Sequence, residues 1–331
     1  MAAEPTIYQV ASAAGVSIST VSLAVNHPER VRPETLRRVL AVADEIGFTP
    51  KERAVIRARR GLGRIAAVGP FSSYPSYQRR LAGALAEIAG APSELVVHDY
   101  EDVAVSGSPL LSTLPVRGQV DGVVIMGVEV DDEVARRLAD RLPTVLLDVR
   151  HELLPSVLVD DLAAAREVGE LFRARGHRRV AFVGEVEATP FAASPVDRRL
   201  QGLRAGFGEE GVDSYLLPRT EDAAEGAVDA ILAAPAADRP TAVFAYRDMV
   251  GLRLLRALRR RGVRLPEEIE LIGYDDEEAA AATGLSSVAH PFEESGRHAV
   301  RLLREMVAHP ERTHSSLQLA YRLVERDTTR G

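Results

Sequence analysis

Five residues stand at the ends of short apolar runs, and four of them carry groups suited to binding a small molecule. They are Met126, Asp148, Asp160, Arg247 and Asp275. Continuous apolar runs of this length are typical of parallel strands covered on both faces. Ligands of open α/β sheets bind beyond the carboxyl ends of such strands. We therefore expect these positions to border a ligand site.

Catalytic chemistry is not expected at these positions. The sequence contains no G-x-S-x-G, P-loop or H-E-x-x-H motif, and its histidines do not have metal-ligand spacing. It has no cysteine, which excludes disulfides and thiolate metal sites. A G-x-G-x-x-A stretch at 61–66 precedes a predicted strand, whereas dinucleotide binding requires a strand before it. We expect no enzyme, no cofactor and no metal.

The elements that must position the strand ends alternate along the chain. Predicted strands cover 65–69, 94–99, 122–126, 144–149, 156–160, 179–184, 242–246 and 270–275. Predicted helices cover 75–90, 161–175, 197–210, 222–234, 248–261 and 292–308. Such alternation predicts an α/β fold of doubly wound parallel sheets, here divided into two lobes. The stretch 98–118 is polar and marked by Pro and Gly, so we expect a degraded helix there.

The first fifty residues have a different pattern. Val10, Ala11 and Ala14 give one helix an apolar face, Gly15 ends it, and Ser17 is a good N-cap for a second helix. Pro33 begins a third helix and Gly47 ends it. Small residues allow the first two helices to cross closely at a steep angle. This geometry presents a second helix to the major groove of DNA, although a generic three-helix bundle is the alternative.

Charge is unevenly distributed in a way that fits a DNA-binding segment. The net charge is −7 overall but +3 over residues 1–62. No apolar run is long enough to span a membrane, and the N-terminus lacks a secretion signal. The sequence therefore favours a cytoplasmic protein with no membrane partner.

The stretch V-A-x-x-A-G-V-S-x-x-T-V-S, followed by Asn26 and a helix ending in G-F-T-P, resembles the lac repressor (LacI/GalR) family. The resemblance continues through VDGVVIM, SVLVDDLAAA, RARGHRRVAFVG and TAVFAYRDMVG to the last helix. It implies a helix-turn-helix headpiece followed by a two-lobed core similar to periplasmic binding proteins. The expected domains are a headpiece at 1–49, a hinge at 50–63, one lobe at 64–160 plus 291–317, and the other at 161–290 plus 318–329.

The resemblance also assigns roles within the headpiece. Residues that read bases would be Ile18, Ser19 and Leu23. Residues that contact the DNA backbone would be Ser17, Thr20, Ser22, Asn26, Arg30 and Thr35. Many relatives carry Arg where Leu23 stands, a residue suited to guanine. Ile18 and Leu23 offer only apolar contact, so we expect a thymine-rich position in the half-site.

The hinge departs from the family pattern. Relatives insert a leucine from this segment into the minor groove. Here Ala54 fits, but Arg57 occupies the leucine position and Ile56 precedes it. Three interpretations stay open: a register shift that uses Ile56, an arginine in a narrow minor groove, and a solvated basic linker.

In the core, the resemblance places effector contacts at Tyr77, Asp148, Arg199 and Asp275, and strand ends add Met126 and Arg247. Relatives carry Asn where Arg247 stands and often Asp where Phe71 stands. An arginine is suited to a carboxylate or phosphate, so Arg247 and Arg199 could hold an anionic group. Alternatively, Arg247 pairs with Asp275 or Asp148. Of Asp275 and Asp276, the latter is the better helix N-cap.

These observations predict a transcriptional regulator that binds a pseudo-palindromic double-stranded DNA operator. We expect a homodimer, with a tetramer possible, that acts as a repressor. A small-molecule effector (a sugar, a sugar derivative or an anionic metabolite) in the cleft between the lobes would modulate operator affinity. Two alternatives stay open: a regulator whose core has lost ligand binding, and an α/β small-molecule binding protein or enzyme.

Overall fold

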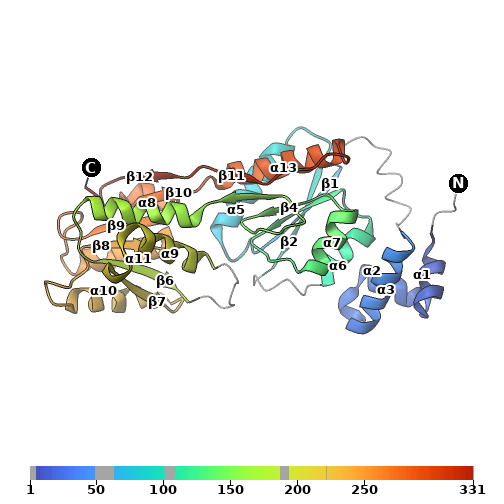
Figure 1. Cartoon of the computed structure of the whole chain (residues 1–331), viewed down its shortest axis with the longest axis horizontal. Helices are drawn as coiled ribbons and strands as arrows, with labels where there is room; N and C mark the ends of the chain where they lie inside the picture. The colour runs from blue at the N-terminus through green and yellow to red at the C-terminus, as the bar shows by residue number, and fades with distance from the viewer. Residues whose placement is uncertain (1–4, 49–62, 101–108, 187–193, 221, 331) are drawn as a thin grey trace. The chain divides into compact units, whose positions relative to one another are not determined.

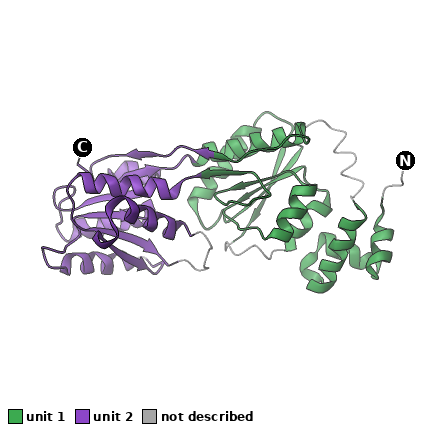
Figure 2. Cartoon of the chain, viewed as in Figure 1, with its two compact units in different colours: residues 1–158, 292–317 green, residues 159–291, 318–331 purple. Residues whose placement is uncertain are grey.

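The computed structural model describes most of the chain as two compact units (Figure 2). One unit comprises residues 1–158 and 292–317, and the other comprises 159–291 and 318–331. The described residues are 5–48, 63–100, 109–186, 194–220 and 222–330. The first unit contains a helical headpiece (residues 5–48) and an amino-terminal lobe (63–158 and 292–317). The second unit is the carboxy-terminal lobe.

The headpiece consists of short helices around a small apolar core. Its elements are α1 (Ile7–Ala14), α2 (Ile18–Asn26), the 3-10 turn η1 (Pro28–Arg30) and α3 (Pro33–Glu45). The predicted helix ends are confirmed. Gly15 follows α1 with a φ of +62°, and Ser17 caps α2 by accepting a hydrogen bond from the Thr20 amide. Thr6 and Gln9 form a capping box that starts α1. The core is filled from all three helices by Val10, Ala14, Val21, Val25, Leu36, Val39 and Leu40.

A six-stranded sheet forms the centre of the amino-terminal lobe, in the order β11-β5-β4-β3-β1-β2. Its strands are β1 (Arg64–Gly69), β2 (Glu94–Asp99), β3 (Gly122–Met126), β4 (Thr144–Leu147), β5 (Ser156–Val159) and β11 (Leu317–Leu319). The pairs from β2 to β5 are parallel. Its helices are α5 (Pro75–Ile88), α6 (Pro109–Arg117), α7 (Asp132–Arg141) and α13 (Phe292–Ala308). Within the stretch 98–118, where a degraded helix was expected, residues 98–99 end β2 and residues 109–117 form α6, which contains Pro115.

The carboxy-terminal lobe is built in the same way, with the strand order β12-β10-β9-β8-β6-β7. Its strands are β6 (Val180–Glu185), β7 (Val212–Leu217), β8 (Ala242–Ala245), β9 (Glu270–Asp275), β10 (Ser286–Ala289) and β12 (Arg322–Val324). Its helices are α8 (Asp161–Ala174), α9 (Pro195–Phe207), η2 (Glu209–Gly211), α10 (Ala223–Ala233), α11 (Asp248–Arg260) and α12 (Glu278–Thr283). Only the β10–β12 pair is antiparallel among the pairings of these described strands. The predicted parallel α/β class is confirmed (Figure 1).

Glycines allow neighbouring helices to approach closely in each lobe. A Cβ atom on Gly206 of α9 would lie 2.0 Å from the Arg166 carbonyl oxygen of α8. A Cβ atom on Gly83 of α5 would likewise lie 1.9 Å from the Glu293 carbonyl oxygen of α13. Because only glycine lacks that atom, these positions set the distance between the helices.

Candidate functional site

The second helix of the headpiece presents two large apolar side chains to solvent. Ile18 is 44% exposed and Leu23 is 38% exposed, although both belong to a small domain with a formed core. Val21, Ala24 and Val25 face inward from the same helix. A stable helix with apolar side chains on its outer face is suited to contacts with another molecule.

Polar groups border these two side chains. Ser19 is exposed, and its hydroxyl lies 2.7 Å from the Ser17 hydroxyl, which also lies 2.8 Å from that of Thr20. At the other end of α2, the Asn26 amide lies 3.5 Å from the Ser22 hydroxyl.

Of the other expected backbone contacts, Arg30 is exposed in η1 and Thr35 is half-buried in the first turn of α3. All nine headpiece residues named from the sequence therefore lie on α2, its cap, η1 or α3. The hinge residues Ala54, Ile56 and Arg57 lie outside the described residues.

In the amino-terminal lobe, Asp148 follows β4 and forms an ion pair with Arg80 of α5. Asp148 has a φ of +62°, an unusual backbone conformation for a residue with a side chain. The Arg80 guanidinium is buried, 4.9 Å from the Tyr77 ring centre and 4.3 Å from that of Phe292. The expected residues Tyr77 and Asp148 are thus joined by an arginine that the sequence analysis did not identify.

Met126 does not contribute to a ligand surface. Its side chain is fully buried at the end of β3, against Gly69 of β1. The strand-end rule selected it by position, but its apolar side chain packs into the lobe.

In the carboxy-terminal lobe, Arg199 of α9 is buried against α8 and β9. Its Nε donates to Asp161 Oδ1 at 3.0 Å, a second nitrogen donates to the Tyr246 carbonyl, and its guanidinium lies 3.5 Å from the Tyr274 ring centre. Burial alone would lower the pKa of Arg199, but the Asp161 carboxylate outweighs burial and raises it. Arg199 is therefore a fixed cation that already has a carboxylate partner.

Arg247 also has a partner within its own lobe, and not the one that the sequence suggested. It pairs with Glu185 at the end of β6, in place of the expected Asp275 or Asp148. Glu185 is 2% exposed; its Oε2 accepts a hydrogen bond from the Tyr246 hydroxyl at 2.8 Å, and its Oε1 lies 3.2 Å from Arg253. Glu185 was missed because the sequence run 179–184 appeared to end before it.

Three aspartates near the carboxyl end of β9 have different surroundings. Asp275 is 8% exposed with a φ of +112°. Asp276 accepts a hydrogen bond from Arg326 at 2.6 Å, and the N-cap of α12 is Glu277, so the N-cap interpretation of Asp276 is wrong. Asp248, the first residue of α11, is fully buried; burial and the nearby Asp275 charge raise its pKa to about 8.

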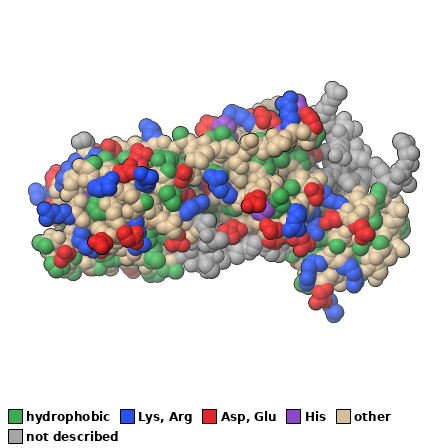
Figure 3. Space-filling view, viewed as in Figure 1, with side chains coloured by type: hydrophobic (Ala, Val, Ile, Leu, Met, Phe, Trp, Pro, Cys, Tyr) green, Lys and Arg blue, Asp and Glu red, His purple; other side chains and the backbone are tan. Residues whose placement is uncertain are grey.

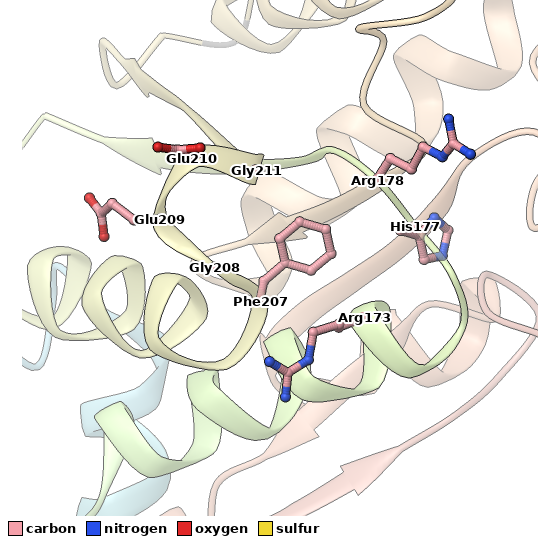
Figure 4. A pocket seen from close by; sticks show the side chains of 8 residues that line it. All are labelled: Arg173, His177, Arg178, Phe207, Gly208, Glu209, Glu210 and Gly211. Carbon is pink, nitrogen blue, oxygen red and sulfur yellow. The ribbon is translucent and has the colours of Figure 1, made fainter.

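A hollow of about 440 Å³ lies elsewhere in this lobe (Figure 4). Residues that line it are Arg173, His177, Arg178, Phe207, Gly208, Glu209, Glu210 and Gly211. They precede β6 and β7, so the hollow lies at the amino ends of these strands, where parallel sheets do not usually bind ligands. It contains none of the expected effector residues.

Among the described residues, no group of His, Asp and Glu side chains could hold a metal ion. No single described helix is long and apolar enough to cross a membrane. Together α1 and α2 would have the length and apolar composition of a membrane span, but the chain bends by 106° between them. On the face shown in Figure 3, arginine and acidic side chains are interspersed.

Two family models match the chain. Residues 6–51 match the model of bacterial regulatory proteins of the lacI family, and residues 170–329 match that of a periplasmic binding protein-like domain. The first match covers the headpiece and the second covers most of the carboxy-terminal lobe. The headpiece and core thus match the kinds of domain that the sequence suggested.

Individual proteins extend the similarity over the whole chain. The HTH-type transcriptional regulator DegA of Bacillus subtilis is 30% identical over 305 residues, which is 88% of each chain. A structure of the transcriptional regulator CelR in complex with cellobiose is 27% identical, with a TM-score of 0.65 over 98% of this chain and 100% of that one. The operator-bound lac repressor dimer, 23% identical, shares the fold with a TM-score of 0.67 over 99% of both chains. The chain therefore belongs to the lacI family of bacterial DNA-binding transcriptional regulators and is not an enzyme.

Proposed function

We propose that the protein is a repressor that binds a pseudo-palindromic operator as a homodimer, with α2 of each subunit in the major groove. The observation that carries this proposal is the outer face of α2, where Ile18 and Leu23 are exposed beside Ser19. Helices of this kind read bases with residues of their first turns, and a two-fold operator matches a two-fold protein. The operator-bound dimer of the lac repressor has the same fold. A tetramer is a further possible assembly.

The apolar side chains define which bases are read. Ile18 and Leu23 would contact thymine methyl groups, and Ser19 would bond to a base edge. Contacts to phosphates would come from residues bordering this face: Ser17, Thr20, Ser22, Asn26, Arg30 and Thr35. We further propose that 1–49 form the DNA-binding domain, that 50–63 form the hinge through Ala54, Ile56 or Arg57, and that the protein acts in the cytoplasm.

Selection of binding sites from random DNA tests this function. We expect the full-length protein to enrich a two-fold symmetric site with an A·T pair at the position that Leu23 contacts. Leu23→Arg should shift this position to guanine, whereas Leu85→Arg, which adds the same charge at an exposed site on α5, should leave the sequence unchanged. A strict guanine requirement opposite Leu23 in the unaltered protein contradicts the proposed reading face.

An effector is proposed to bind at the carboxyl ends of the strands in each lobe. The groups that support this are Tyr77 and Asp148 in one lobe, and Arg247 and Asp275 in the other. In the carboxy-terminal lobe, Arg247 and Arg253 both pair with the single carboxylate of Glu185. Two arginines on one carboxylate favour a ligand with a carboxylate or phosphate, and among the described residues the buried Arg247 Nε has no hydrogen-bond partner.

The same ion pairs also favour a second candidate, a regulator whose core no longer binds a ligand. Arg199 is already paired with Asp161 and bonded to the Tyr246 carbonyl, and Arg247 is paired with Glu185. Thermal unfolding of the protein with cellobiose, ribose, glucose 6-phosphate and citrate separates the two candidates, because a bound ligand raises the melting temperature. A shift with the anionic compounds that Arg247→Ala abolishes supports an anionic effector. Unchanged melting with all four compounds favours the second candidate.

A further inference from the structure

Two helices of the amino-terminal lobe end against the carboxyl ends of headpiece helices. Arg117, the last residue of α6, donates from Nε to the Val25 carbonyl oxygen of α2 at 2.8 Å. Arg141, the last residue of α7, donates to the carbonyl oxygens of Ala43, Asp44 and Phe48 at 3.2, 2.8 and 3.2 Å. Both arginines therefore bind carbonyl groups in or just after the last turn of a headpiece helix; the carbonyls of Ala43 and Asp44 also accept from the Phe48 and Gly47 amides.

The side chain of Asp44 strengthens this contact. Arg137 donates from Nε to Asp44 Oδ2 at 2.7 Å, and Arg141 Nε lies 3.1 Å from Asp44 Oδ1. The Arg137 side chain is 8% exposed and that of Arg141 is 16% exposed. An ion pair with so little solvent around it has a larger electrostatic energy than a surface pair.

The headpiece and the amino-terminal lobe complement each other in more than their charged side chains. The carboxyl end of a helix carries a partial negative charge, and a guanidinium beside it is favourable. Val116 of α6 is fully buried and packs with the apolar core of the headpiece. The contact thus combines helix capping, a shielded ion pair and a buried apolar side chain.

This contact leaves the outer face of α2 accessible. Ile18 and Leu23 remain exposed with the headpiece in place, while Val25, which faces inward, supplies the carbonyl that Arg117 binds. The lobe thus approaches α2 through its last turn and leaves the proposed base-reading residues open to solvent.

We propose that Arg117, Arg137 and Arg141 are positioning residues for DNA binding: they hold the headpiece on the amino-terminal lobe with the reading face of α2 presented. The proposal rests on the DNA-binding function but concerns residues that do not touch DNA. Their contribution is preorganisation, since a headpiece already oriented loses less freedom when it binds. Movement of α6 or α7 would then reach α2 directly, through these arginines.

Operator binding by the full-length protein tests the role of Arg141. Arg141→Gln removes the carbonyl contacts, and Arg136→Gln is the matched control, since it removes one charge from an exposed position on the same helix. We expect Arg141→Gln to lower operator affinity about tenfold. The dependence of affinity on salt should keep its slope, because a lost phosphate contact would reduce that slope by about one. The proposal is overturned if Arg141→Gln reduces the salt slope. It is also overturned if Arg141→Gln binds the operator as tightly as Arg136→Gln, or more tightly than the unaltered protein.

A distance measurement without DNA tests the contact itself. The chain has no cysteine, so Arg38→Cys on α3 and Ala139→Cys on α7 allow two spin labels to be placed at exposed sites. We expect one narrow distance distribution, which both Arg141→Gln and Asp44→Ala broaden and Arg136→Gln preserves. A distribution that is broad from the start, or unchanged by both variants, contradicts the contact even if the protein binds its operator.

Discussion

The carboxyl group of Asp248 accepts a hydrogen bond of 2.6 Å from the hydroxyl of Ser287, at a position with no solvent exposure. Its other oxygen accepts from the Glu277 amide at 2.8 Å. Burial and the charge of Asp275 raise the pKa of Asp248 to about 8. At neutral pH the folded lobe thus holds a proton that the unfolded chain releases.

This proton makes stability depend on pH. The contribution of Asp248 is fully present below its unfolded pKa, near 4, and is lost as pH rises through about 8. The free energy of unfolding should therefore fall by about 1.4 kcal/mol per pH unit from this group between pH 5 and 7. Asp248→Asn does not titrate; its Oδ1 can accept from the Glu277 amide and its Nδ2 can donate to the Ser287 hydroxyl. Urea unfolding at several pH values should show the two proteins diverging, and parallel curves would falsify the assignment.

A second prediction concerns Arg199. Arg199→Ala leaves the buried Asp161 carboxylate with only the longer pair to Arg198, at 3.6 Å, which should cost about 3 kcal/mol of unfolding free energy. Arg166→Gln, which removes an exposed pair with Glu170, should change stability by less than about 0.5 kcal/mol. Urea denaturation measures both. If the two variants lowered the unfolding free energy by equal, small amounts, Arg199 would not be needed to stabilise the lobe and could bind a ligand.

The pair of Arg80 and Asp148 gives a third prediction. Asparagine tolerates the left-handed backbone of Asp148, so Asp148→Asn removes the charge and leaves the φ of +62° accessible. Arg80 is 3% exposed, and loss of its carboxylate partner should destabilise the protein by about 3 kcal/mol. Asp132→Asn is the control, since its carboxylate is 81% exposed. A melting temperature shared by both variants would argue that the pair contributes little.

The glycines between α8 and α9 give a fourth prediction. Gly206→Ala places a methyl group 2.0 Å from the Arg166 carbonyl oxygen and should cost about 1–3 kcal/mol or more. Gly226 lies in the exposed part of α10, and no atom of the described residues would lie within 4 Å of a Cβ there, so Gly226→Ala should stabilise the protein by about 0.5–1 kcal/mol. Thermal unfolding should show a lower melting temperature for Gly206→Ala and a higher one for Gly226→Ala. An unchanged melting temperature for Gly206→Ala would mean that α8 and α9 can separate at little cost in free energy.

Patterns that act locally were predictable from the sequence. Gly15, Ser17 and Gly47 mark helix ends through backbone and capping chemistry, and β1 and β3 are continuous apolar runs. The headpiece core and most of the parallel strands could be predicted for these reasons.

Elements and partners that depend on distant residues were not predictable. β7 alternates because it is a half-exposed edge strand, and β10 begins with two serines that are buried because Thr328, Thr329 and Asp248 satisfy them. Arg80 and Glu185 lie far along the chain from Asp148 and Arg247, and no periodicity links a charge to its partner. The acidic and basic pairs of the site were therefore visible only in the folded chain.

The apolar outer face of α2 has a thermodynamic consequence. Non-specific attraction to DNA comes from phosphates and weakens with salt, whereas contact between Ile18 or Leu23 and a thymine methyl group removes apolar surface from water. Discrimination between operators at these positions should therefore vary little with ionic strength and carry a negative heat-capacity change. Temperature, more than salt, would then set how sharply this protein distinguishes one operator from another.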